Sequence, residues 1–409
     1  MCLTSWYPPH HFGGYELSCF DVMTRLEERG HHVEVLCSEQ RLPGVEDPDT
    51  EHEDRVHRRL QLYWQGHDLW APPLRQRLAI ERANQEALAD ALASCRPDVV
   101  TIWQVGAMSL GLISGVIDSG VPLVYAVCDV WPAYATKLDA WLRLFARRPA
   151  VGRLVERVVG VPSTAPALDG SGAFLFNSDL VRRQCRAGSP WQFPLSAVVY
   201  SGIEGRVFSG TRHDPASPWR GRLLFVGRLD PRKGLGTLLR ALPLLPDATL
   251  AVHGPGSDAE LARWRGEATS LGVADRVTFA TTDRSDLPAV YAEADACVFP
   301  SEWDEPFGLV PVESMACAAP VVATGAGGSA EFLVDGENCL LYPAGDPAAL
   351  ADAVKRLAGD RDLRAHLAEH GLATAEFFDV EHLADDFEAW HGWMASGGVG
   401  DPPKERRPS

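Results

Sequence analysis

The chain alternates short apolar segments with longer amphipathic ones over most of its length. The apolar segments have the length and the β-branched composition of buried strands, and the segments between them have a helical periodicity. Strand candidates lie at 33–37, 98–103, 122–127, 173–178, 197–202, 222–227, 249–254, 276–281, 296–301 and 320–324. This alternation is typical of βαβ units and predicts an α/β fold with parallel sheets.

The length of 409 residues exceeds what one hydrophobic core usually holds and suits two domains. A polar segment with glycine and proline, 204–221, precedes a new strand and marks the best boundary. Only five residues precede the first turn, so either the first strand is unusually short or the sequence begins a few residues late. We predict doubly wound domains at 1–203 and 204–380, a helix at 381–395 that crosses back to the first domain, and a disordered tail at 396–409.

The composition excludes several classes of protein. A net charge of −17 argues against bulk attraction to nucleic acid or to an anionic membrane. Nine scattered cysteines without a C-x-x-C pair favour reduced thiols over a disulfide framework or a zinc site. The sequence has no membrane-spanning apolar run and no signal-like start. We therefore expect a cytoplasmic enzyme or binding protein.

The stretch EPFGLVPVE places two carboxylates around a predicted helix start. Proline is tolerated only in the first turn of a helix, so Pro311 sets the start near Gly308 or Leu309. Glu305 then lies in the preceding loop, and Glu313 lies about one turn inside the helix. Free N–H groups at such a start bind hydroxyl or anionic oxygens. The alternative is a helix-capping Glu305 with a surface Glu313.

Two further turns join a strand to a helix and could bind phosphate. Arg228 and Lys233 follow the strand at 222–227 and could clamp a diphosphate, although two solvated cations are the simpler interpretation of the pair alone. Gly13 and Gly14 follow the first strand and would let the backbone approach a ligand, or they only allow tight packing.

Three other segments have weaker interpretations. The glycine-rich turn at 325–332 serves structure at least as readily as ligand binding. The segment 252–259 matches G-x-G-x-x-A, but Pro255 inside the turn argues against a nicotinamide or flavin cofactor. The segment 135–161 mixes arginines with apolar residues, for which a solvated helix face is favoured over contact with a membrane surface or an anionic acceptor.

In this order and spacing, the motifs resemble the retaining GT-B glycosyltransferases of family four. The resemblance covers nearly the whole chain and is most specific in the second half. It depends on GG at 13–14, NS at 177–178, YSGIE at 200–204, GRLDPRKG at 227–234, PSEWDEPFGL at 300–309, VESMAC at 312–317, GGSAE at 327–331 and DGEN at 335–338.

The resemblance implies two Rossmann-like domains that face an interdomain cleft and a nucleotide-diphosphate sugar as donor. Arg228, Lys233 and Glu305 are the implied catalytic residues, with the two cations on the diphosphate. The other implied donor contacts are Gly13 and Gly14 near the diphosphate, the backbone amides of Phe307, Gly308 and Leu309 with Glu305 at the sugar, and Glu313 at the ribose. Neither a metal nor another cofactor is expected.

One departure concerns the position after the strand at 122–127, where the family often has His-Asp. Here the pair is Cys128 and Asp129, so Asp129, His10 and His11 are the remaining candidates for a polar group near the donor sugar. Gly254, at the end of the strand 249–254, is a further candidate for donor binding.

The predicted function is transfer of a sugar, with retention of anomeric configuration, to a small-molecule, glycan or lipid acceptor. Two alternatives stay open. One is a catalytically degenerate protein that binds sugar nucleotides without transfer. The other is a glycoside hydrolase or phosphorylase that uses Glu305 and Glu313 as an acid/base pair, which would need to face each other across about 5 to 9.5 Å.

Overall fold

The computed structural model describes residues 1–48, 50–65 and 68–408. The chain divides into two compact units. Unit 1 comprises Met1–Tyr200 with Leu383–Arg406, and unit 2 comprises Ser201–His382 with the residues from Arg407 onward. No helix in the described part of the chain is long and apolar enough to cross a membrane.

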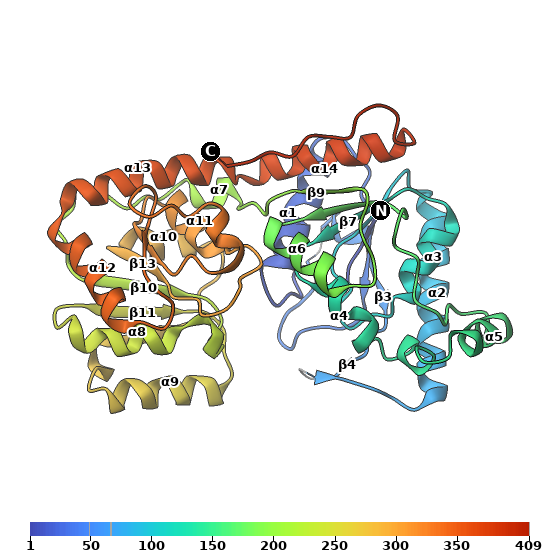
Figure 1. The fold of residues 1–409 in the computed structure, drawn as a ribbon, viewed down its shortest axis with the longest axis horizontal. Helices are drawn as coiled ribbons and strands as arrows, with labels where there is room; N and C mark the ends of the chain where they lie inside the picture. Colours follow the sequence, from blue (N-terminus) through green and yellow to red (C-terminus); the bar gives the residue numbers. More distant parts are fainter. Residues whose placement is uncertain (49, 66–67, 409) are drawn as a thin grey trace. The chain divides into compact units, whose positions relative to one another are not determined.

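Unit 1 is built on a seven-stranded parallel sheet of order β3-β2-β1-β6-β7-β8-β9 (Figure 1). Its strands are β1 (Cys2–Leu3), β2 (Val35–Ser38), β3 (Val56–Leu60), β6 (Val100–Ile102), β7 (Leu123–Val127), β8 (Ala173–Phe176) and β9 (Ser196–Val198). A separate antiparallel pair consists of β4 (Trp64–Gln65) and β5 (Asp68–Leu69). The strand order reverses at β1, because the chain first runs outward to β3 and then returns to the other side of β1.

Helices follow the strands of unit 1 as the alternating sequence pattern predicts. They are α1 (Gly14–Glu28), α2 (Leu74–Cys95), α3 (Gly111–Ser119), α4 (Trp131–Leu138), α5 (Pro149–Val159), α6 (Asp179–Gly188) and α14 (Val380–Ala395), which unit 1 contains from Leu383. Helices α2 and α3 pack together, as do α4 and α6. Right-handed crossovers then place α1 and the later crossover helices on opposite faces of the sheet.

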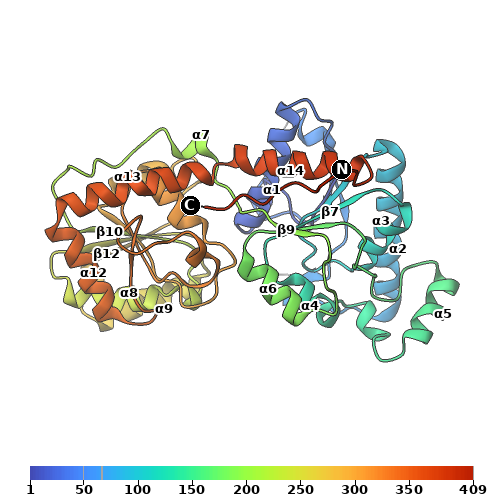
Figure 2. The ribbon, with the colours of Figure 1, turned by 45° about the horizontal axis from the view of Figure 1, so that its top comes forward.

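Helix α14 packs onto unit 1 through aromatic and charged side chains. The ring of Phe387 stacks on Trp103 with 5.0 Å between centroids, and Arg29 pairs with Glu388 at 2.8 Å. His391 Nε2 lies 2.7 Å from the hydroxyl of Thr101 on β6. These contacts join the helix to the sheet and to the end of α1, and Figure 2 shows α14 beside α1.

Part of the predicted disordered tail has fixed partners in unit 1. Glu405 Oε1 accepts hydrogen bonds from Arg182, at 2.6 Å, and from the backbone N–H of Val198, at 2.9 Å. Arg406 forms ion pairs with Asp385 at 3.1 Å and with Asp386. Composition alone predicted disorder because it does not reveal that opposite charges lie within reach on the folded unit.

Unit 2 has a six-stranded parallel sheet of order β12-β11-β10-β13-β14-β15. Its strands are β10 (Arg222–Val226), β11 (Thr249–His253), β12 (Val277–Ala280), β13 (Ala296–Phe299), β14 (Val321–Ala323) and β15 (Leu340–Leu341). Its helices are α7 (Gly205–Phe208), α8 (Leu235–Ala241), α9 (Asp258–Ser270), α10 (Leu287–Glu293), α11 (Leu309–Ala316), α12 (Pro347–Gly359) and α13 (Arg361–Phe377). Here the order reverses between β10 and β13, which are neighbours in the sheet.

Candidate functional site

The candidate site of unit 2 lies at the carboxyl ends of β10 and β13. These neighbouring strands leave the sheet in the same direction, and the helical connections that follow them run to opposite sides of the sheet. Such a switch point opens a crevice where open α/β sheets bind their ligands. The loop after β10 carries Arg228 and Lys233, and the loop after β13 carries Glu305, so the topology brings the two predicted motifs together.

Lys233 and Glu305 form an ion pair at the centre of this site. Lys233 Nζ lies 2.6 Å from Glu305 Oε1, and the exposed fractions of the two side chains are 19% and 6%. The same oxygen accepts a hydrogen bond from Ser301, at 2.9 Å. No described residue donates to the second carboxylate oxygen of Glu305, which therefore keeps its capacity to accept from a ligand hydroxyl.

Three contacts lock the two loops to each other. The backbone N–H of Glu302 donates to the carbonyl of Arg232 at 2.9 Å. A Cβ atom at Gly234 would lie 1.8 Å from the carbonyl oxygen of Pro300, so only glycine permits this close approach. The Trp303 ring lies under the Arg232 guanidinium, 4.7 Å away, and 5.6 Å from Lys233 Nζ. The loops therefore form one pre-organised platform.

The glycine-rich turn at 325–332 supports the backbone of Glu305. The N–H of Gly328 donates to the Glu305 carbonyl at 2.6 Å. Gly327 has φ of +74°, and a Cβ there would meet the backbone N and O of Glu305 at 2.2 and 2.4 Å. Both the conformation and the space require glycine, so this turn has a structural role in positioning the carboxylate.

Helix α11 begins at Leu309, which confirms the start predicted from Pro311. Gly308 precedes it with φ of +100°, a conformation that favours glycine. The Phe307 ring is buried and packs against Phe332 and Phe378, with centroids 5.1 and 5.2 Å away. The first N–H groups of the helix have no acceptor within it and remain suited to a ligand oxygen.

Glu313, one turn into α11, is held by a partner that the sequence did not indicate. Tyr291 on α10 is buried, and its hydroxyl donates to Glu313 Oε2 at 2.7 Å. Burial raises the pKa of Tyr291 well above its ordinary value, so the phenol keeps its proton and acts as the donor. Glu305 and Glu313 are therefore fixed by different elements.

Arg228 differs from Lys233 in its surroundings. It is exposed at the end of β10, and among the described residues it forms no hydrogen bond or ion pair. A guanidinium without a protein partner at a switch point can bind a phosphate in two-pronged fashion. Gly254, the other candidate nearby, packs so closely on Gly227 that a Cβ would lie 2.0 Å from its carbonyl oxygen, which already explains why glycine occurs there.

In unit 1, Gly13 and Gly14 lie at the start of α1, beyond the carboxyl end of β1. The N–H of Gly13 donates to Glu16 Oε2 at 3.1 Å. A Cβ at Gly13 would meet no described atom within 4 Å, so packing does not require glycine there. The space above Gly13 is consistent with a ligand that approaches the backbone, and that role stays a prediction.

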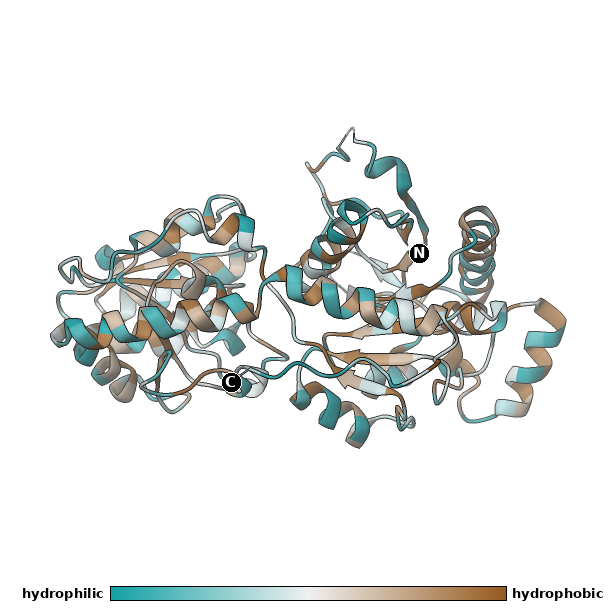
Figure 3. Cartoon of the chain, turned by 90° about the horizontal axis from the view of Figure 1, so that it is seen from above, coloured by the Kyte–Doolittle hydropathy of each residue, from teal (hydrophilic) through white to brown (hydrophobic). Residues whose placement is uncertain are grey.

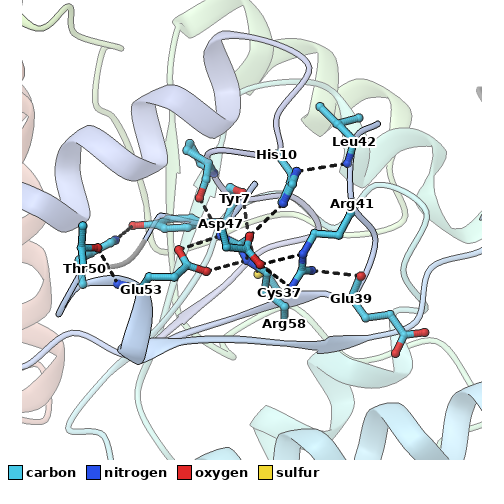
Figure 4. A network of polar contacts seen from close by, with 12 residues as sticks. Tyr7, His10, Cys37, Glu39, Arg41, Leu42, Asp47, Thr50, Glu53 and Arg58 are labelled. Carbon is cyan, nitrogen blue, oxygen red and sulfur yellow. Dashed lines mark hydrogen bonds and ion pairs between the residues drawn. The ribbon is translucent and has the colours of Figure 1, made fainter. Parts of the chain in front are cut away.

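His10 has a structural environment (Figure 4). The ring is buried, Nδ1 accepts from the N–H of Leu42 at 3.1 Å, and Nε2 lies 2.9 Å from Asp47 Oδ1. Because Nδ1 accepts, Nε2 carries the proton and donates to Asp47. Arg58 also pairs with Asp47, at 3.1 Å, and donates to the carbonyl of Pro8. His10 thus fastens the segment after β2, and burial lowers its pKa.

Asp129 also has local partners. Its two oxygens accept from the N–H of Trp131, at 3.0 Å, and from the hydroxyl of Tyr134, at 2.7 Å, so both bind within the start of α4. Burial raises the pKa of Asp129. His11 lies half-buried in the turn before α1. The roles predicted for Asp129, His10 and His11 near the donor sugar stay predictions.

Sequence reasoning missed Ser301, Trp303 and Tyr291 as parts of the site. Ser301 and Trp303 occur inside the motif PSEWDEPFGL, so their position was visible. The sequence did not show that Ser301 donates to Glu305 within this loop or that Trp303 contacts Arg232 and Lys233 from the loop after β10. Tyr291 lies outside every motif, and only its buried contact with Glu313 reveals its part.

Two family models match the chain. The model described as Glycosyltransferase Family 4 covers residues 12–190, and the model described as Glycosyl transferases group 1 covers residues 218–373. Together they span most of both units.

Curated relatives carry names of the same kind. D-inositol 3-phosphate glycosyltransferase of Stackebrandtia nassauensis is 36% identical over 180 residues, which are 41% of this chain and 40% of that protein. Phosphatidyl-myo-inositol mannosyltransferase of Mycobacterium leprae is 34% identical over 232 residues, which are 54% of this chain and 59% of that protein. The chain thus spans about half the length of the curated relatives that it matches.

Solved structures resemble the whole chain. Sucrose-phosphate synthase from Thermosynechococcus elongatus superposes with a TM-score of 0.71 at 22% identity, covering 97% of this chain and 99% of that chain. Anabaena HepE in complex with UDP and glucose gives a TM-score of 0.66 at 21% identity, covering 95% and 97%. These similarities show the GT-B fold. With a glycosyltransferase model matched in each half, the chain belongs to the group 1, family 4 glycosyltransferases of this fold.

Proposed function

We propose that this chain is a retaining glycosyltransferase that takes a sugar from a nucleoside-diphosphate donor. The observation that carries the proposal is the platform at the β10/β13 switch point, where Lys233 and Glu305 pair beside an exposed Arg228. In the chain of −17 net charge, these two cations are the local groups suited to an anionic donor. Relatives named as glycosyltransferases and the complexes of HepE with UDP support the same conclusion.

Each part of the donor has a proposed partner in unit 2. Arg228 and Lys233 bind the diphosphate, and Glu305 with the N–H groups at the start of α11 binds the sugar hydroxyls. Glu313, held by Tyr291, accepts from the ribose hydroxyls. The two cations supply the charge that a metal supplies in other transferases, so we propose that transfer needs no added divalent ion.

In the proposed reaction, the bond between the anomeric carbon and the diphosphate oxygen breaks first, through an oxocarbenium-like transition state. The acceptor hydroxyl attacks from the face that the nucleoside diphosphate leaves, and its proton passes to the departing phosphate oxygen. Negative charge grows on the diphosphate as it departs. Loss of one preorganised cation there costs about 3 kcal/mol of transition-state stabilisation, or about a hundredfold in rate.

Donor hydrolysis offers a test that does not require the acceptor. The purified chain is incubated with uridine, guanosine and adenosine diphosphate sugars, with and without EDTA, and released sugar is followed by proton NMR before mutarotation. We expect one donor class to be hydrolysed with retained configuration. Lys233→Ala and Glu305→Ala should lower the hydrolysis rate about a hundredfold or more. Lys355→Ala, at a matched surface lysine that pairs with Asp352, should not.

Each alternative has its own outcome in the same experiment. Donor binding by calorimetry without hydrolysis or transfer would indicate a degenerate binding protein. Cleavage of a simple glycoside without nucleotide would indicate a hydrolase or phosphorylase. A product of inverted anomeric configuration would refute the proposed mechanism. So would Lys233→Ala and Glu305→Ala variants that hydrolyse the donor as fast as the parent.

A further inference from the structure

The segment 137–159 in unit 1 combines exposed apolar side chains with exposed arginines. Leu138, Leu144 and Val151 are exposed, and the exposed fractions of Leu154 and Val158 reach 61% and 75%. These five residues are close in sequence, whereas scattered single hydrophobic residues on a surface need no explanation. We call the exposed side chains of residues 137–159 the α5 surface.

Helix α5 has an apolar face that unit 1 covers only in part. With 100° per residue, Val155, Val159 and Gly152 share one side of the helix, and this side packs inward. Val155 and Val159 pack on the core of the unit, and a Cβ at Gly152 would lie 2.6 Å from the carbonyl oxygen of Ser163.

The adjacent strip of α5 holds Val151, Leu154 and Val158, which stay exposed. Figure 3 shows hydrophobic and hydrophilic residues alternating along this helix. The apolar face of α5 is therefore wider than the part that packs on unit 1. The sequence favoured a solvated helix face for this segment, and the structure exposes both its arginines and part of its apolar side.

Cationic side chains flank the exposed strip. Arg143, Arg147, Arg148, Arg153 and Arg157 are all exposed, and within the described part of the chain none of them forms an ion pair. The segment has six cationic and two acidic side chains, although the whole chain has a net charge of −17. Of the two acids, Asp139 is buried, and Glu156 accepts from the N–H of Ser163 at 3.2 Å. Positive charge therefore dominates the surface.

We propose that the α5 surface docks this protein onto an anionic lipid bilayer. The exposed strip enters the boundary between headgroups and acyl chains, and the arginines beside it reach the lipid phosphates. A second copy of the chain is a poorer occupant, because two α5 surfaces would bring like charges together. The inference does not depend on the donor site, so it holds whatever activity the chain has.

Vesicle sedimentation tests the proposal with the full, tag-free chain. The parent should bind vesicles of phosphatidylcholine with phosphatidylserine or phosphatidylglycerol, and the binding should weaken with salt and with loss of the anionic lipid. Leu154→Glu/Val158→Glu should abolish binding. Arg153→Gln/Arg157→Gln should lower the partition coefficient about fivefold for each arginine, or about thirtyfold together.

Matched surface changes in unit 2 serve as controls. Leu244→Glu alters another exposed leucine, and Arg356→Gln/Arg361→Gln removes two other exposed arginines. These variants should sediment like the parent, and thermal unfolding checks that every variant folds. If the glutamate variant fails to fold, the arginine variant still decides. The proposal would be overturned if all variants bound equally or if the parent did not bind anionic vesicles. It would also be overturned if the chain were a dimer in solution that Leu154→Glu dissociates.

An independent cluster in unit 2 has the composition of a transition-metal site. His366 and His370 lie one turn apart on α13, with ring centroids 4.2 Å apart. Glu337 approaches both, at 2.6 Å from His370 Nδ1 and 3.6 Å from His366 Nε2. One ligand atom from each residue lies within 4.8 Å of the others.

The position of Glu337 is fixed by its neighbour. Asn338 donates to the carbonyl of Phe332, at 2.7 Å, and to the hydroxyl of Thr374 on α13, at 3.0 Å. This second contact lies one turn beyond His370, so the turn that carries Glu337 is already attached to the helix that carries the imidazoles. Two imidazoles and one carboxylate form a set that suits Zn²⁺ or Co²⁺, with a fourth position for water.

From this geometry we infer a site for a zinc-class divalent ion that joins the turn at 334–338 to α13. Cobalt absorption and thermal shift on tag-free protein test it, with Mg²⁺ as the control ion. Zn²⁺ and Co²⁺ should bind and raise the melting temperature. His370→Ala and Glu337→Gln should weaken binding by about tenfold or more, and His32→Ala, at an exposed histidine beside Glu34, should not. A cobalt spectrum unchanged in His370→Ala would overturn the inference.

Discussion

Removal of the Glu305 carboxylate tests how the donor platform is held together. In Glu305→Ala, the ammonium of Lys233 loses the oxygen that lies 2.6 Å away, and its side chain is only 19% exposed. Ser301, which donates to the same oxygen at 2.9 Å, also loses its acceptor. The variant therefore leaves a mostly buried ammonium and a buried hydroxyl without their acceptor.

The size of the effect follows from the geometry. At 2.6 Å and an effective dielectric constant of about 20, the gross attraction is about 6 kcal/mol, most of which offsets desolvation of the two groups. Breaking a buried pair from one side costs about 3 to 5 kcal/mol. The partial exposure of Lys233 places the expected loss at the lower limit, about 3 kcal/mol. For a unit of this size, that loss lowers the melting temperature of unit 2 by roughly 6 to 12 °C.

A double-mutant cycle in urea isolates the pair. Glu305→Ala and Lys233→Ala should each destabilise, and the double variant should lose about 1 to 3 kcal/mol less than their sum. The exposed pair of Lys355 and Asp352, at 3.4 Å, should show coupling below about 1 kcal/mol. Energies that add within about 0.5 kcal/mol at Lys233 and Glu305 would refute the reasoning, because the pair would then contribute nothing to the platform.

Three further changes probe other parts of the structure. Gly327→Ala should destabilise unit 2 by about 3 kcal/mol in urea, because its Cβ would lie 2.2 Å from the backbone nitrogen of Glu305. Gly336→Ala has a similar φ but open space around the Cβ, so it should cost only about 1 kcal/mol. Tyr291→Phe should weaken binding of a nucleoside diphosphate several-fold by calorimetry, but leave a 2′,3′-dideoxy analogue unaffected, because Glu313 loses its donor. Burial raises the pKa of Glu81 from 4.5 to about 8, so between those pH values the native state holds a proton that the unfolded state releases. The free energy of unfolding should therefore fall by about 1.4 kcal/mol for each unit of rising pH in that range. Glu81→Gln should flatten that slope in thermal unfolding at pH 5 to 8, and an unchanged slope would contradict it.

The parallel sheets were predictable because their central strands are buried on both faces. Such strands are continuous apolar runs, and all ten predicted runs overlap strands of the structure. Strand β3 (Val56–Leu60) was missed because Arg58 and Arg59 interrupt its apolar pattern. Arg58 is nevertheless an anchor, since it pairs with Asp47 and Glu53. A buried cation with two partners cannot be distinguished from a solvated one by sequence alone.

The site was predictable where its geometry is local. Pro311 fixes the start of α11 through its own ring, and Gly308 supplies the left-handed residue before it, so both act within a few residues of Glu305. The approach of Gly234 to Pro300 instead joins segments separated by two strands and their helices. Such a contact exists only when the sheet orders β10 beside β13, and no local pattern encodes that order.

The two acids of EPFGLVPVE show what the tertiary contacts add. The sequence presents them as a pair, and an acid/base pair for glycoside cleavage was one interpretation. In the structure, Glu305 belongs with Lys233 from the loop after β10, whereas Glu313 belongs with Tyr291 from α10. One oxygen of Glu305 accepts from both an ammonium and a hydroxyl, so the carboxylate is held as an acceptor beside the switch point. Separate anchors therefore suit two acceptors that each hold hydroxyls of one extended ligand, and substitutions at Lys233 and Tyr291 should affect different parts of it.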